Sequence, residues 1–174
     1  MREIDALLAE CRAAPLTHYK LDKLITHSEN ARVGDFLLDV IDDPNQNFTL
    51  RIAAMRVFGF GSVNRRNQRR LRESLFRIIT AKKVPDPLLR EHALCSVENH
   101  GYGDRPEMAK VLLAILSDPQ KPAIYRLVAL GAIATSGKWP EREPIVRGLV
   151  DDADPDVASL ARRLLSERSS RRKA

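Results

Sequence analysis

The side chains best suited to chemistry lie in one stretch of ten residues, from Glu91 to His100. This stretch contains two histidines, one cysteine and two glutamates. His92 and Cys95 are three residues apart, a spacing that places two metal ligands on the same face of a helix. A stable zinc site needs three or four ligands, and no second Cys/His pair in the chain has a matching spacing. We therefore expect neither a metal ion nor another cofactor.

Other signatures of catalysis are also missing from the sequence. It contains no Gly-rich phosphate loop and no Gly-x-Ser-x-Gly turn. His18 and His27 lie near the N-terminus, with no evident partners for a catalytic triad. An enzyme needs several reactive side chains that converge on one pocket. We therefore expect that the protein is not an enzyme.

A second group of candidates is a cluster of five arginines within eight residues. Its members are Arg65, Arg66, Arg69, Arg70 and Arg72. The N-terminus of a helix disfavours cations, so helix stability does not explain five arginines at a predicted helix start. Guanidinium groups bind phosphate oxygens well, which makes the backbone of a nucleic acid one candidate partner. Alternatively, the cluster contacts an acidic protein or only solvent.

The elements that must position these residues repeat along the chain. Asp-Pro pairs, which suit the N-cap and first turn of a helix, begin at Asp43, Asp86, Asp118 and Asp154. Each pair is followed by an alanine with apolar neighbours at helical spacing: Ala54, Ala93, Ala129 and Ala161. These alanines are 39, 36 and 32 residues apart. Self-similarity at such a period is typical of a solenoid of helical repeats.

The frame Asp-Pro, then Arg-x-x-Ala, resembles the second helix of a HEAT repeat over roughly residues 31–168. The resemblance implies an armadillo-like α-solenoid, in which antiparallel helix pairs stack and their inner helices line a concave surface that often binds protein. It also implies that the frame arginines Arg51, Arg90 and Arg126 bond an aspartate in a neighbouring repeat. The last copy has Ala158 at the arginine position, as suits a terminal repeat without a following neighbour.

The sequence thus predicts an all-α fold, a short right-handed α-α superhelix within one domain. A helical cap (1–30) comes first, with one helix that Pro15 ends and a second helix up to about Ser28. Four helix pairs follow at about 31–60, 67–99, 106–135 and 141–167, and then a basic disordered tail (169–174). The predicted outer helices are 31–42, 67–82, 106–117 and 141–150. The predicted inner helices are 46–59, 87–99, 121–135 and 156–167. Glycines such as Gly61 and Gly101 follow inner helices, where left-handed C-caps are expected.

The repeat register also predicts which inner-helix residues face the concave side. They are Ile52, Arg56, Glu91, His92, Cys95, Leu127, Gly131, Ser159 and Arg163. This predicted strip mixes apolar, acidic and basic residues, as a protein-binding surface does. We expect a non-catalytic interaction module, either an adaptor or an inhibitor of the immunity-protein type. The partner-binding residues would be Arg56, Glu91, His92, Cys95 and Arg163.

The alternative function is nucleic-acid backbone binding through the arginine cluster. Some HEAT-like proteins are DNA glycosylases, but such enzymes hold a base between aromatic side chains. Trp139 is the only tryptophan here, in a predicted loop, and the aromatics form no cluster. No apolar run approaches the ~18 residues that span a bilayer. Two cysteines give no disulfide framework, and the acidic start is unlike a signal peptide, so we expect a cytoplasmic protein. We also expect it to be a monomer.

Overall fold

The computed structural model describes residues 2–13, 15–135 and 139–171, with only the backbone described for 139–141 and 169–171. Within these ranges the chain has ten α-helices, two short 3-10 helices and no strand, and about 75% of it is helical. This confirms the prediction of an all-α fold. The chain divides into two compact units, Met1–Ser96 and Val97–Ala174, and the division falls within helix α6 (Pro87–Asn99).

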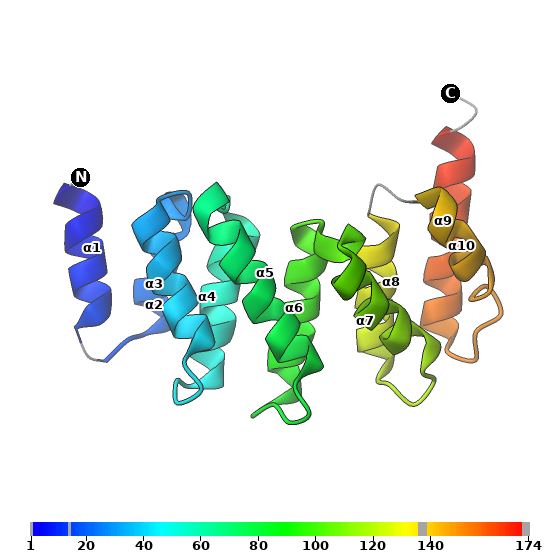
Figure 1. The fold of residues 1–174 in the computed structure, drawn as a ribbon, viewed down its shortest axis with the longest axis horizontal. Coiled ribbons are helices and arrows are strands. Elements are labelled where there is room, and N and C mark those ends of the chain that lie inside the picture. The colour runs from blue at the N-terminus through cyan, green and yellow to red at the C-terminus, as the bar shows by residue number, and fades with distance from the viewer. Residues whose placement is uncertain (1, 14, 136–138, 172–174) are drawn as a thin grey trace. The chain divides into compact units, whose positions relative to one another are not determined.

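In the first unit, α3 lies at the centre and packs against both α4 and α5 (Figure 1). Its elements before α6 are α1 (Arg2–Arg12), α2 (His18–Asp22), the 3-10 helix η1 (Ile25–His27), α3 (Ala31–Asp42), α4 (Phe48–Phe60) and α5 (Arg65–Thr80). The apolar stripe of α3 reads Leu37, Leu38 and Ile41, and all three are fully buried. Phe58 of α4 and Leu71 of α5, the two helices that pack against α3, are also fully buried. Amphipathic periodicity therefore sets this packing.

The N-terminal cap was predicted to contain two helices, and the structure differs from this prediction in the second one. The stretch expected to form one helix up to about Ser28 forms α2 and then η1. Consecutive three-residue hydrogen bonds, from Leu24 N–H to Leu21 and from His27 N–H to Leu24, tighten the chain here. Leu21 and Leu24 are both fully buried although the segment is short.

In the second unit, α8 (Ala123–Ala134) is the central helix, and nine of its twelve residues are buried. It packs against α7 (Pro106–Ser117), α9 (Trp139–Arg147) and α10 (Pro155–Arg171). The 3-10 helix η2 (Tyr102–Asp104) approaches α8 so closely that a Cβ at Gly103 would lie 2.3 Å from the carbonyl oxygen of Ala132. Only glycine fits at that position.

Each frame alanine is completely buried. Ala54, Ala93, Ala129 and Ala161 all have 0% exposed surface. The predicted outer helices 31–42 and 106–117 coincide with α3 and α7, and the predicted inner helix 87–99 coincides with α6. The repeat pattern therefore locates both the helices and the side chains at their core.

Several boundaries correct the sequence-based expectation. Trp139, predicted in a loop, begins α9, and α10 continues to Arg171, into the stretch predicted as a disordered tail. Residues 172–174 lie outside the described part of the chain. Gly101 has the expected left-handed conformation, with φ 65°. Gly61 is extended instead, with φ −113° and ψ −175°, because the chain runs on directly toward α5.

The Asp-Pro pairs act in two different ways. Asp86 and Asp154 directly precede α6 and α10, as predicted. Asp43 and Asp118, by contrast, lie before turns, and α4 and α8 begin only at Phe48 and Ala123. In all four pairs the aspartate carboxylate accepts the N–H two residues ahead, at 2.8–3.0 Å. The shared feature is therefore an Asx turn, and the prediction of a helix start at Asp43 and Asp118 is wrong.

The frame arginines each bind the end of the preceding helix. The Nε of Arg51 donates to the carbonyl of Ile41 at 2.8 Å, and that of Arg126 donates to Leu116 at 3.2 Å. Arg90 donates to Ala81, just after α5. The last carbonyls of a helix have no partner in the helix and attract cations. Each of these arginines therefore caps the helix that precedes its own.

Candidate functional site

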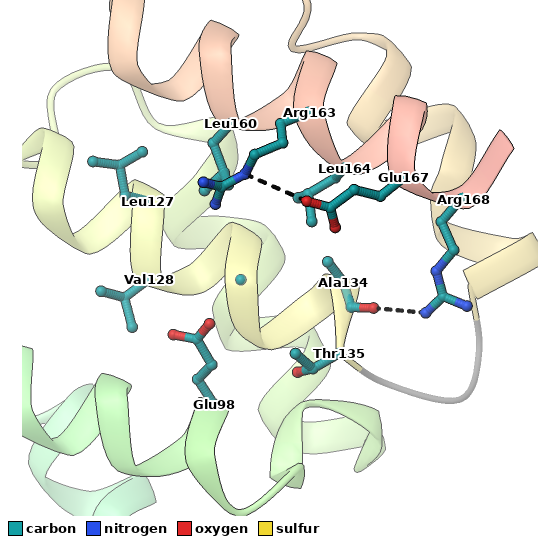
Figure 2. Close-up of a pocket in the computed structure, with 11 residues that line it drawn as sticks. Glu98, Leu127, Val128, Ala134, Thr135, Leu160, Arg163, Leu164, Glu167 and Arg168 are labelled. Carbon is teal, nitrogen blue, oxygen red and sulfur yellow. Dashed lines mark hydrogen bonds and ion pairs between the residues drawn. The ribbon is translucent and has the colours of Figure 1, made fainter. Parts of the chain in front are cut away.

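A groove of about 490 Å³ lies on the second unit between α8 and α10 (Figure 2). Apolar side chains from both helices line it: Leu127, Val128, Ala134, Leu160 and Leu164. Charged side chains of both signs stand among them: Glu98, Arg163, Glu167 and Arg168. Helical spacing explains this composition, because residues four apart, such as Leu160 and Leu164, lie on one face of α10.

Gly131 shapes the groove because it has no side chain. It lies four residues after Leu127 on α8, so both face the same way. A Cβ at residue 131 would lie 2.3 Å from Oε1 of Glu98, which projects from α6. Because glycine has no side chain, the Glu98 carboxylate can lie directly against the backbone of α8.

Glu98 is a half-buried carboxylate without a bonding partner among the described residues. Burial raises its pKa, because the apolar surroundings disfavour the charged form. The nearby cations are engaged elsewhere. Arg163 lies 3.8 Å from the Glu167 carboxylate, and Arg168 donates to the Ala134 carbonyl at 3.2 Å. An ionised carboxylate in such a place costs stability, which a ligand cation would offset.

The groove brings together three members of the predicted strip, Leu127, Gly131 and Arg163. Glu91, His92 and Cys95 lie in the first unit, half-buried on α6. Arg56 is exposed on α4, with its guanidinium carbon 5.6 Å from the ring centre of Phe60, which is itself 69% exposed. The position of Glu98 beside Gly131 was not predicted, because the two residues are 33 positions apart in the sequence and lie on different helices.

The histidine and cysteine candidates do not assemble into a ligand set. Within the described ranges, no three His, Cys, Asp or Glu side chains are placed to hold one metal ion. His100 instead stacks on Tyr102, with ring centres 5.4 Å apart. Burial lowers the pKa of His100, and its Nε2 has no hydrogen-bond partner in the part of the chain that the structure describes. This imidazole is therefore held neutral at physiological pH.

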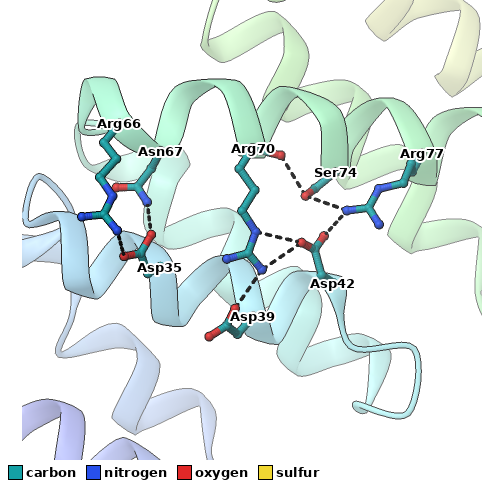
Figure 3. Close-up of polar contacts among 8 residues, drawn as sticks. All are labelled: Asp35, Asp39, Asp42, Arg66, Asn67, Arg70, Ser74 and Arg77. Atoms are coloured by element: carbon teal, nitrogen blue, oxygen red, sulfur yellow. Dashed lines mark hydrogen bonds and ion pairs between the residues drawn. The ribbon is translucent and has the colours of Figure 1, made fainter.

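Most of the arginine cluster faces acidic residues of its own chain. On α3, aspartates at positions 35, 39 and 42 form one face, and α5 packs against it (Figure 3). Arg70 binds both Asp39, at 2.8 Å, and Asp42, at 3.1 Å. Arg66 lies 3.3 Å from Asp35. The spacing of these aspartates was visible in the sequence, and it was the signal that could have predicted the pairing.

The other three arginines of the cluster differ in their surroundings. Arg69 pairs within α5, with Glu73 at 2.8 Å, and Arg72 is half-buried. Arg65 is exposed, and of the five arginines it alone has a side chain without a hydrogen bond or ion pair to the residues that the structure describes. The positive charge available to an outside anion is therefore smaller than the sequence indicates.

The chain matches no family model, no curated protein and no solved structure. What the helices and their packing support is an all-α chain compatible with helical repeats. None of the helices in the described ranges is both long enough and apolar enough to cross a membrane.

Proposed function

We propose that this chain is a non-catalytic, HEAT-like interaction module that binds a partner protein in the groove between α8 and α10. The observation that carries the proposal is the Glu98 carboxylate, which has no bonding partner among the described residues and lies in a groove lined by apolar side chains of α8 and α10. Protein interfaces combine an apolar centre with a polar rim, and the groove offers both. An adaptor and an inhibitor of the immunity-protein type are both consistent with this arrangement.

The groove favours one kind of occupant, a partner segment that carries apolar side chains next to a lysine or arginine. The apolar side chains would cover Leu127, Leu160 and Leu164. The cation would bond Glu98, whose charge no described residue compensates. A charge that destabilises the free protein and stabilises its complex is a common feature of binding sites.

The test is capture of partners from nuclease-treated extract of the native cell. Leu164→Arg places a cation in the groove and should abolish capture of the partner, and Glu98→Gln should weaken it. Ile124→Arg is the matched control, because Ile124 is 41% exposed on α8 but does not line the groove. Capture of the same proteins by all three variants would contradict the proposal.

The alternative is nucleic-acid backbone binding through Arg65–Arg72, and the observation that favours it is the exposed, unpaired Arg65. Against it stand the ion pairs of Arg66 and Arg70 with α3, which reduce the free charge of the cluster. Titration with duplex and single-stranded oligonucleotides at two salt concentrations separates the two functions. Binding that survives physiological salt and is lost in Arg65→Glu would favour this alternative.

A further inference from the structure

Two arginines at the same frame position have different partners. In the second unit, the Arg126 guanidinium forms a two-point ion pair with Asp152, and its Nη1 lies 2.9 Å from the carboxylate. These side chains are only 6% and 11% exposed. Arg51 in the first unit is equally buried, at 8% exposed, and donates its Nε to a helix end in the same way. Beyond that bond, the Arg51 side chain has no hydrogen bond or ion pair to any described residue, and Asp42 and Asp43 attract it only from a longer distance.

The sequence shows why Arg51 lacks a carboxylate. Asp152 lies two residues before the pair Asp154-Pro155. The same place before Asp86-Pro87 is occupied by Val84, which follows two lysines. The first unit therefore keeps the buried arginine but has an apolar residue where the second unit has its counter-ion. Desolvation consequently lowers the pKa of Arg51, since burial disfavours its charge.

A pocket of about 300 Å³ occupies this place in the first unit. Both Arg51 and Val84 line it, together with two further cations, Arg77 and Lys83. The only acidic side chain among the lining residues is Asp42, and Arg70 and Arg77 already bind its carboxylate, at 2.9–3.2 Å (Figure 3). The pocket therefore carries an excess of positive charge.

We propose that this pocket binds the carboxylate of a ligand beside Arg51, in the place that Asp152 occupies beside Arg126. The planar guanidinium fork suits a carboxylate, which accepts two parallel hydrogen bonds. Lys83 is exposed at the pocket and adds a second cation for the ligand. Ile78 and Leu89 supply apolar walls for a short aliphatic stem. The carboxylate belongs either to a free dicarboxylate or to a glutamate side chain of a peptide.

The test measures the melting temperature of the full chain with succinate, with a blocked glutamyl peptide and with inorganic phosphate, at constant ionic strength. We expect a saturable rise with at least one carboxylate, because a ligand that binds only the folded state stabilises it. Val84→Asp supplies the missing carboxylate within the chain. This variant should melt higher than wild type without ligand and should lose the response to ligand.

Two further variants complete the design. Leu88→Asp adds the same charge at an exposed residue outside the pocket, and it should keep the response to ligand. Lys83→Gln should weaken the apparent affinity severalfold without loss of folding, since Lys83 is exposed. The proposal is overturned if neither carboxylate raises the wild-type melting temperature, if phosphate alone does so, or if Val84→Asp responds as wild type does. The relative affinities of succinate and peptide identify the source of the carboxylate.

Discussion

The carboxylate of Glu98 on α6 lies directly against residue 131 of α8, so closely that a Cβ at Gly131 would be 2.3 Å from Oε1. The chain thus holds an acid in a half-buried position and gives it no cation among the described residues. Since burial raises the pKa of Glu98, the folded protein binds this proton more tightly than the unfolded chain does. The stability associated with Glu98 is therefore fully present below pH ~4.5 and is lost as the pH rises through the folded-state value.

Glu98→Gln should therefore stabilise the protein at pH 7, because burial opposes ionisation of the wild-type carboxyl group there. Near pH 4 the two proteins should melt at nearly the same temperature, because both side chains are then neutral. Thermal unfolding at the two pH values measures the difference. Equal melting at pH 7 would show that Glu98 has a partner in solution, and would remove the main support for a cation-binding groove.

His100 should make stability depend on pH in the opposite sense. Burial lowers its pKa below the ordinary value of 6.5, so the unfolded chain binds the proton more tightly. This stability is present above pH ~6.5 and is lost as the pH falls toward the folded-state value. Between pH 7.5 and 5, His100→Gln should therefore show a smaller fall in melting temperature than wild type. Measuring both proteins in a Glu98→Gln background removes the opposing effect of that acid.

The buried pair of Arg126 and Asp152 should matter far more than an exposed pair. Asp152→Asn leaves a buried guanidinium without its counter-ion and should cost about 3 kcal/mol. Glu73→Gln, which breaks the exposed pair with Arg69, should cost far less, because solvent screens that pair. Urea denaturation of the two variants gives both values. Similar costs would mean that the Arg126 pair is hydrated in solution.

The ion pairs between α3 and α5 predict which arginine is structural. Arg70→Glu loses two partners and places a third carboxylate beside Asp39 and Asp42, so it should destabilise the fold by about 1–2 kcal/mol. Arg65→Glu should change stability by less than about 0.5 kcal/mol. Adding Asp39→Arg to Arg70→Glu should restore part of the loss, and a double variant no more stable than Arg70→Glu would contradict the pairing.

The sequence predicted the helices well wherever local signals were sufficient. The Asp86 cap before α6 is readable from a few residues, and the frame alanines follow helical spacing. The α2–η1 segment was not predicted, since its winding depends on tertiary packing of Leu21 and Leu24. The groove was predicted only in part. The position of Glu98 could not be predicted, because it depends on the absence of a side chain at Gly131 on α8.

The hydrogen bonds from frame arginines to helix ends span only nine or ten residues, across the turn that joins two helices. A residue inserted between Leu116 and Arg126 would pull donor and acceptor apart, whereas residues added between one helix pair and the next would leave this bond intact. An insertion within a helix pair should therefore disturb the fold more than an insertion between two pairs. We likewise expect the insertion or deletion of a whole helix pair to be tolerated better than a change of length within a pair, since Arg51, Arg90 and Arg126 each bind within their own pair.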